Sequence, residues 1–162
     1  MTDQTRDLVL ITGASGFVGS AVARIALQKG FAVRVLVRAT SPRRNVEALD
    51  AEVVVGDMRD EASMRVALRG VRYLLHVAAD YRLWAPDPLE IERANLEGAE
   101  ATMRAALKEG VERIVYTSSV ATLKVTSSDQ SADETWAQGA AVVALRELYE
   151  SPWGTTGPAP AL

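Results

Sequence analysis

Three glycines that follow an apolar run near the start of the chain constrain the fold most strongly. Residues 8–11 (LVLI) have the pattern of a strand, and residues 12–19 (TGASGFVG) join it to a helical pattern. Glycines at this spacing allow a tight turn, a close approach of the backbone to a phosphate, and close packing of helix on strand. The first N–H groups and the dipole of the helix then attract negative charge. This context predicts a dinucleotide-binding turn, the alternative being a turn that merely needs glycines.

Short apolar runs rich in β-branched residues recur along the chain and alternate with helical patterns. Three of them are nearly continuous, which is typical of strands buried on both faces of a parallel sheet. The runs are residues 8–11, 33–37, 53–55, 73–77 and 113–116. Because strand and helix alternate from residue 8 to about residue 120, the sequence predicts right-handed βαβ units and a doubly wound α/β fold.

The helical patterns have recognisable ends. Asp and Pro favour the start of a helix, and Gly favours the position just past its end. Helices are predicted from Val18 to before Gly30, from Asp60 to Leu68, and from Asp87 and Pro88 to before Gly110. One apolar stripe of the last helix is expected to contain Leu96, Ala99, Met103, Ala106 and Leu107. A fourth, shorter helix is predicted over residues 42–49.

Composition excludes several kinds of chemistry. The chain has no cysteine and one histidine, His76, so disulfides and cysteine-based catalysis are excluded and no metal site is expected. Eighteen Lys and Arg against 21 Asp and Glu give a net charge of −3, which argues against nucleic acid as a partner. No apolar run approaches the roughly 20 residues of a membrane span. Because the first residues are polar, no signal peptide is expected and the predicted location is the cytoplasm.

The sequence changes character after Leu123. Residues 1–123 are predicted to form a dinucleotide-binding core, and residues 124–162 a divergent C-terminal segment. Residues 140–149 fit one helical segment. The three prolines among residues 151–162 predict an irregular tail there.

A group of arginines follows the second predicted strand. NAD-binding sites place an Asp or Glu near this point to hold the ribose hydroxyls, but no acidic residue occurs here between Asp7 and Glu47. Arg38, Arg43 and Arg44 stand in this region instead, and a guanidinium suits a 2′-phosphate. The sequence therefore favours NADP over NAD, the alternative being a solvated basic loop.

Further stretches carry a family resemblance. They are residues 56–60 (GDMRD), 76–80 (HVAAD), 95–98 (NLEG) and 116–119 (YTSS). Together with the glycine loop, they resemble the extended short-chain dehydrogenases/reductases of the NAD-dependent epimerase/dehydratase family. HVAADYRLWAPDP and VERIVYTSSVATL are most similar to hopanoid-associated sugar epimerases and dihydroflavonol 4-reductase-like proteins. The resemblance covers about residues 7–135 and implies a Rossmann-type sheet, incomplete here, with about five strands.

The resemblance implies roles for the matched positions only. The positions that would line the cofactor's pyrophosphate are Gly13, Ser15, Gly16, Phe17, Val18 and Gly19. Arg38 would meet the 2′-phosphate, Asp57 and Met58 the adenine, and Val77, Ala78 and Ala79 the ribose between the two halves of the cofactor. Thr117 and Ser118 would lie near the nicotinamide, Ser119 would be the catalytic hydroxyl that bonds the substrate carbonyl, and Asn95 would brace the site. His76 is expected to be a packed side chain rather than a catalyst.

One catalytic pair of this family has no match in the chain. The family places Tyr-x-x-x-Lys on the next helix to donate and accept a proton. The lysines here are Lys29, Lys108 and Lys124, and the residue four positions after Tyr149 is Trp153. General acid–base catalysis is therefore expected to be impaired.

Two functional hypotheses remain open. The first is the NAD(P)-binding half of an isomerase or oxidoreductase, an epimerase or reductase acting on a sugar nucleotide or similar carbonyl compound. In that case the sequence is that of a truncated or frameshifted product, and a substrate is expected only if a complete active site is supplied. The second is a non-catalytic NADP-binding sensor or partner module. In either case, self-association is expected through a sheet edge left open beside residues 113–120.

Overall fold

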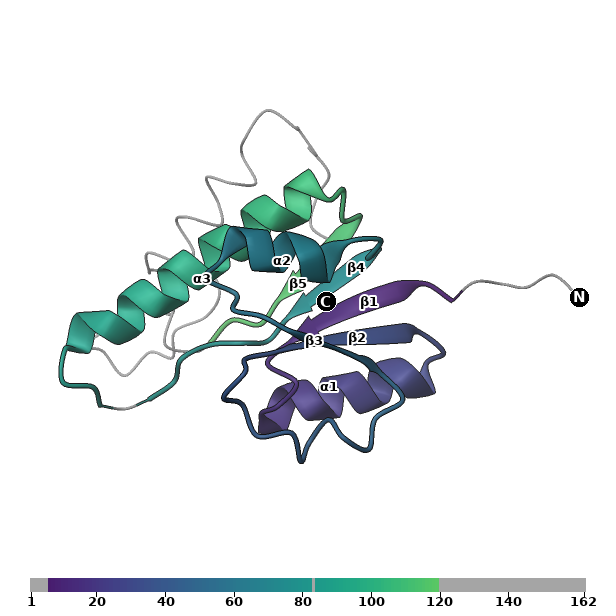
Figure 1. Ribbon diagram of the computed structural model, residues 1–162, viewed down its shortest axis with the longest axis horizontal. Coiled ribbons are helices and arrows are strands. Elements are labelled where there is room, and N and C mark those ends of the chain that lie inside the picture. The colour runs from purple at the N-terminus through teal and green to yellow at the C-terminus, as the bar shows by residue number, and fades with distance from the viewer. Residues whose placement is uncertain (1–5, 83, 120–162) are drawn as a thin grey trace, which may run out of the picture. The chain divides into compact units, whose positions relative to one another are not determined.

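The computed structural model describes residues 6–82 and 84–119 (Figure 1). The chain divides into two compact units, Met1–Thr117 and Ser118–Leu162. Every helix and strand given below belongs to the first unit. The domain boundary expected at residue 123 lies outside the described residues.

Within the described residues, five parallel strands form one sheet in the order β3-β2-β1-β4-β5. The strands are β1 (Leu8–Thr12), β2 (Ala32–Val37), β3 (Glu52–Val55), β4 (Tyr73–His76) and β5 (Arg113–Tyr116). Each begins and ends within one residue of its predicted run, and the doubly wound α/β fold is confirmed.

The described helices are α1 (Phe17–Gln28), α2 (Glu61–Leu68) and α3 (Pro88–Lys108). Their predicted starts and ends are confirmed. Asp60 and Asp87 cap α2 and α3, because each carboxylate accepts a hydrogen bond from the amide two residues ahead at 3.0 Å. A glycine with positive φ follows each helix, at Gly30 (86°), Gly70 (73°) and Gly110 (70°).

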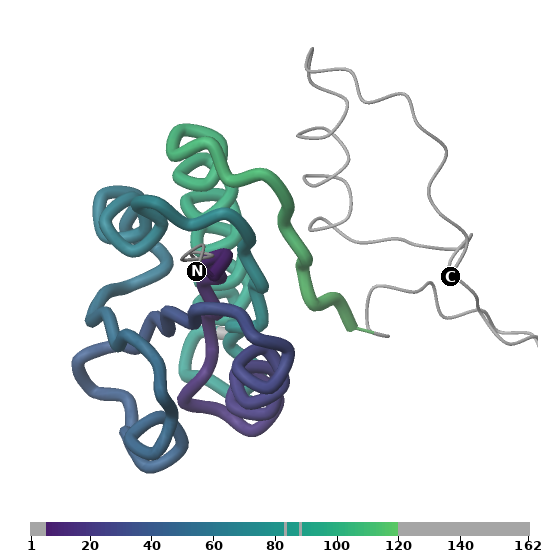
Figure 2. Tube along the Cα trace, turned by 90° about the vertical axis from the view of Figure 1, so that its right-hand side faces the viewer, coloured from purple at the N-terminus to yellow at the C-terminus, as the bar shows by residue number. Residues whose placement is uncertain are grey.

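The two faces of the sheet pack against different helices. On one face, Ala23 and Ala26 of α1 join Val9, Ile11 and Val35 in a buried core. On the other face, side chains of α2 and α3 pack on the strands. That second core contains Leu10, Leu36, Leu74, Met64, Ala67, Leu68, Ala105 and Ala106. Figure 1 shows α1 on the opposite side of the sheet from α2 and α3, and Figure 2 shows the same separation after a quarter turn.

The predicted helix over residues 42–49 is wrong. The amides of Val46 and Glu47 both donate to the Arg43 carbonyl, at 2.8 and 2.9 Å, and the Leu49 amide donates to the Val46 carbonyl, which makes a turn. Val46 is 2% exposed and packs in the core under α1. Tertiary packing of this side chain therefore overrides the local helical pattern.

The predicted stripe of α3 is also wrong in part. Leu96 and Leu107 are 39% and 62% exposed, whereas Thr102 and Ala105 are fully buried. The buried face lies further round the helix because the small Gly98 allows close packing, as a Cβ there would lie 2.8 Å from the Met58 Cε atom. No helix within residues 6–82 and 84–119 is long and apolar enough to cross a membrane.

Candidate cofactor-binding site

The candidate site lies where the strand order reverses. β1 is flanked by β2 on one side and by β4 on the other, and all strands end at the same edge of the sheet. Thr12, the last residue of β1, is in register with Leu36 and with His76. Ligands of doubly wound sheets bind outside the carboxyl ends of the strands at this switch point. The glycine loop after β1 and the segment after β4 are therefore brought together.

Gly13 forms the contact between these two segments. Its φ is +75°, and a Cβ on it would lie 2.8 Å from the backbone nitrogen of Ala78. Gly19 packs as closely behind the loop, because a Cβ there would lie 2.2 Å from the Gly13 carbonyl oxygen. Side chains at either position would push the loop away from the strand ends.

Gly16 lies at the open side of the loop and forms the N-cap of α1. A Cβ on Gly16 would meet only the Gly13 carbonyl oxygen, at 3.3 Å. Among the described residues, no side chain caps this helix start, and its first turn has no acidic residue. The first amides of α1 are thus available to an anion. The open side of the loop at Gly16 and these amides together fit a pyrophosphate. Phe17 and Val18 are exposed, so their backbone would make this contact.

Thr12 and His76 form a buried polar pair beneath the loop. The Thr12 hydroxyl accepts hydrogen bonds from the amides of Val77 and Ala78, both at 3.1 Å, and lies 3.0 Å from His76 Nδ1. Because the hydroxyl already accepts two bonds, its own proton points to Nδ1, and the imidazole proton is on Nε2. His76 is 2% exposed and stacks on Tyr116. It has the packed position that the sequence predicted.

Burial keeps the His76 imidazole neutral. Desolvation lowers its pKa from 6.5 to about 4. A neutral, hydrogen-bonded ring of this kind supports the strand ends without supplying charge to the site.

Arg38 lies near two carboxylates at the ends of the strands. The pKa of Asp57 is lowered mainly by its hydrogen bond with Arg59, and that of Asp80 mainly by its hydrogen bond with Arg82. The charge of Arg38 contributes to both shifts. Asp57 and Asp80 are ion-paired with Arg59 and Arg82, and Arg38 has no ion pair within the described part of the chain. Arg38 is therefore a cation with capacity for an anionic ligand.

The two expected adenine contacts have different surroundings. The Asp57 carboxylate accepts hydrogen bonds from the Arg59 guanidinium, the shortest at 2.7 Å, and from the Arg59 amide at 2.9 Å. Met58 is half-buried and packs against Gly98 of α3. Arg59, which the sequence did not single out, thus fixes the carboxylate that was expected to meet the adenine.

Asn95 of α3 holds the segment that follows β4. Its Oδ1 accepts from the Asp80 amide at 2.6 Å, and its Nδ2 donates to the Asp80 carbonyl at 2.8 Å. This reciprocal pair fixes the backbone just past Val77, Ala78 and Ala79. Asn95 is thereby a bracing residue for this segment.

The expected nicotinamide and catalytic positions follow β5. The Thr117 amide donates to the His76 carbonyl at 2.9 Å, which extends the pairing of β5 with β4. Ser118 and Ser119 are exposed and begin the second unit. Tyr149 and the predicted helix over residues 140–149 lie outside the described residues.

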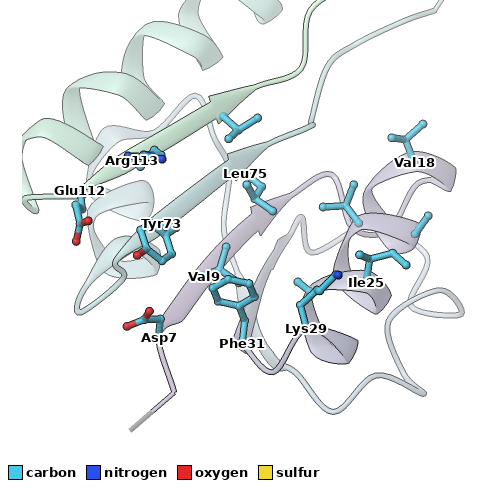
Figure 3. A pocket seen from close by; sticks show the side chains of 14 residues that line it. Asp7, Val9, Val18, Ile25, Lys29, Phe31, Tyr73, Leu75, Glu112 and Arg113 are labelled. Atoms are coloured by element: carbon cyan, nitrogen blue, oxygen red, sulfur yellow. The ribbon is translucent and has the colours of Figure 1, made fainter. Parts of the chain in front are cut away.

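A cavity of about 690 Å³ lies elsewhere in the first unit, on the face of the sheet beside α1 (Figure 3). It is lined by α1 and by side chains of β1, β4 and β5 on this face of the sheet, including Val9, Tyr73, Leu75 and Val115. Val18 is its one lining residue from the glycine loop. This apolar trough opens on the sheet face rather than at the strand ends, so it is distinct from the candidate cofactor site.

A glycine loop at the switch point of a doubly wound sheet defines the class of nucleotide-binding α/β proteins. Residues 9–149 match the model of the NAD dependent epimerase/dehydratase family, and the chain belongs to this family. The resemblance noted in the sequence is thereby confirmed.

Named relatives agree with this assignment. A candidate dihydroflavonol 4-reductase of Synechocystis sp. is 42% identical over 130 residues, which are 80% of this chain and 38% of that protein. The dihydroflavonol 4-reductase of Zea mays is 34% identical over 140 residues, covering 79% of this chain and 39% of that protein. The chain thus spans about two fifths of the length of these curated relatives.

Solved structures share the fold. The crystal structure of gox2253 is 46% identical with a TM-score of 0.81, over 90% of this chain and 48% of that one. A UDP-glucose 4-epimerase of Thermus thermophilus, solved in complex with NAD, is 28% identical with a TM-score of 0.73, over 88% of this chain and 50% of that one.

Proposed function

We propose that the first unit binds a dinucleotide cofactor and prefers NADP to NAD. The observation that carries the proposal is the contact of Gly13 with Ala78, where the loop after β1 meets the segment after β4 and only glycine fits. The pyrophosphate would lie on the amides from Gly13 to Gly19, and the ribose beside Val77, Ala78 and Ala79. Asp57 and Met58 would border the adenine.

Arg38 supports the preference for NADP. It lies at the end of β2, its charge reaches Asp57 and Asp80, and both carboxylates are already paired with other arginines. A 2′-phosphate would form charge-assisted hydrogen bonds with its guanidinium. Arg43 and Arg44 belong to the neighbouring turn and would add to the positive potential.

The proposed reaction class is that of an epimerase or reductase with a sugar nucleotide or similar carbonyl substrate. A nicotinamide cofactor supplies hydride transfer. Thr117 and Ser118 would border the nicotinamide, and Ser119 would hold the substrate carbonyl. Because no Tyr-x-x-x-Lys pair occurs in the sequence, proton transfer has no family donor here, and we expect catalysis to be impaired.

A second candidate function is a non-catalytic dinucleotide-binding module, such as a redox sensor or partner subunit. The same absent pair favours it, since cofactor binding needs only the glycine loop and its surroundings. Turnover distinguishes the two functions. With NADPH or NADP and a panel of sugar nucleotides, the module would bind cofactor without turnover, whereas an enzyme would give product in proportion to protein concentration.

Binding itself is tested by following NADPH fluorescence during titration with the wild type and with Gly16→Val. Gly16 has φ −88° and ψ 179°, which valine adopts readily, and the new side chain would occupy the approach to the helix start. We expect saturable binding by the wild type and at least about a 10-fold loss in the variant, which should still unfold cooperatively although valine is a poorer N-cap than glycine. No binding by the wild type, or equal binding by the variant, would contradict the proposal.

A further inference from the structure

Asn45 connects the basic turn after β2 to the glycine loop. Its Nδ2 donates a hydrogen bond to the Ser15 carbonyl oxygen at 2.7 Å, between residues 30 positions apart in the sequence. The side chain is half-buried. Nothing in its sequence context indicates this contact.

The acceptor belongs to a peptide group that matters for anion binding. The Ser15 carbonyl and the Gly16 amide are the two ends of one peptide group, and the Gly16 amide donates to the Gly13 carbonyl at 2.9 Å. Both polar atoms of this peptide group are therefore held. Gly16 is the N-cap of α1, so the orientation of this peptide group sets where the first amides of the helix point.

We propose that Asn45 is a positioning residue for the cofactor's pyrophosphate, acting through the Ser15–Gly16 peptide group. The amide of Asn45 engages the Ser15 carbonyl, which keeps this partial negative charge from turning toward a phosphate. Glycine at position 16 gives this peptide group freedom to rotate. The hydrogen bond from Asn45 to the Ser15 carbonyl, called the clamp below, removes that freedom before the ligand binds. This inference rests on the proposed function and adds to it a residue that acts on the bound phosphates.

The backbone that carries Asn45 is held in place by packing and by hydrogen bonds of its turn. The next residue, Val46, is 2% exposed within the core under α1. The Arg43 carbonyl closes the turn by accepting from the amides of Val46 and Glu47. Asn45 therefore reaches Ser15 from an anchored backbone, and little side-chain entropy is lost on forming the bond.

Two variants separate the chemistry of Asn45 from its shape. Asn45→Leu keeps a similar size and removes the donor without adding charge, whereas Asn45→Asp replaces the donor with a negative charge that also opposes the neighbouring arginines. Because the pyrophosphate is common to both cofactors, we expect Asn45→Leu to weaken NADPH and NADH by the same factor, about 3- to 10-fold. Asn45→Asp should weaken both cofactors at least as much, and NADPH more than NADH, because its charge also repels the 2′-phosphate. Glu47→Ala is the matched control, since Glu47 lies in the same turn with an exposed side chain. It should leave both affinities unchanged.

Amide hydrogen exchange gives a readout that needs no cofactor. The Gly16 and Ser20 amides, which donate to the Gly13 and Gly16 carbonyls, should exchange faster in Asn45→Leu. The Lys29 amide, bonded to Ile25 at the far end of α1, is the internal reference and should not change.

The outcomes are distinct. Unchanged affinities in both folded variants would overturn the inference. A loss for NADPH alone in Asn45→Leu would also overturn it, because Asn45 would then act on the arginines instead. A lower melting temperature with unchanged affinities would show a merely structural role. If the wild type binds neither cofactor, the proposed function fails, while faster Gly16 exchange in Asn45→Leu would still support the clamp.

Discussion

At the scale of single residues, the hydroxyl of Thr12 joins two strand ends and the segment that follows one of them. It serves the amides of Val77 and Ala78 and the ring of His76 at the same time. A buried hydroxyl with all its partners stabilises the structure, whereas removal of one partner leaves a desolvated polar group. The position of Ala78 against Gly13 therefore depends on a polar pair that makes no contact with the proposed ligand.

His76 makes folding stability depend on pH. Its pKa falls from 6.5 to about 4 through burial, so between these values the unfolded chain binds a proton that the folded chain does not. Stability should therefore be complete above pH 6.5 and decrease as the pH falls toward 4, by up to about 3 kcal/mol from this residue. Urea unfolding at several pH values measures this loss. His76→Gln has no titrating ring, and an equally steep loss in that variant would contradict the assignment.

The sequence predicted the residues whose role is local. Gly13, Gly16 and Gly19 were identified because their spacing after a strand has a direct backbone meaning. Asn45 and Arg59 were not, because the value of a hydrogen bond across 30 residues depends on where a turn packs. The pairing of Arg59 with Asp57 is local, but either side chain alone has the ordinary appearance of a surface charge.

At the scale of helices and strands, the ends were predicted better than the faces. Asp60, Asp87 and the glycines after each helix act through bonds within a few residues, so they can be identified from sequence. The buried face of α3 instead depends on what it packs against. Gly98 and Ala105 allow close packing there, and larger apolar residues such as Leu107 remain exposed.

Gly19 and Gly98, the two glycines within the described helices, should respond differently to substitution by alanine. A Cβ at Gly19 would lie 2.2 Å from a backbone oxygen, whereas one at Gly98 would meet the flexible Met58 side chain at 2.8 Å. We expect Gly19→Ala to cost more than about 2 kcal/mol, because backbone must move. Gly98→Ala should stay within about 1 kcal/mol of the wild type, since alanine's higher helix propensity offsets the adjustment of Met58.

Chemical denaturation of both variants measures this difference. Equal destabilisation by the two substitutions would show that Gly19 is not packed as closely against the loop as the structure has it.

At the scale of the whole molecule, the two faces of the described sheet are buried to different extents. The face of β4 that carries Leu74 is fully buried by α2 and α3, whereas Val115 on the α1 side is 53% exposed beside the apolar trough. β5 is also the last strand of the sheet within the described residues. Parallel sheets are ordinarily covered on both faces, and an open apolar edge favours pairing with another chain.

We therefore expect concentration-dependent self-association through β5. Val115→Lys should shift the protein toward monomer, because a charge would be placed at the contact. Val66→Lys is the matched control, as Val66 is 57% exposed on α2, which packs on the opposite face of the sheet from Val115. Sedimentation velocity measures the self-association of the wild type and of both variants. A wild type that is monomeric at every concentration, or an equal effect of the control, would contradict the expectation.

Cofactor choice at Arg38 tests most directly whether this is an NADP-binding domain. The measurement is the dissociation constant of NADPH and of NADH for the wild type and for Arg38→Asp, at low and high salt. Charge-assisted hydrogen bonds to the 2′-phosphate should make NADPH bind about 10- to 150-fold tighter to the wild type. The difference should narrow at high salt. Arg38→Asp should reverse the order, because a carboxylate repels the phosphate and accepts from the ribose hydroxyls. Equal affinities in the wild type, or an unchanged order in the variant, would contradict this assignment.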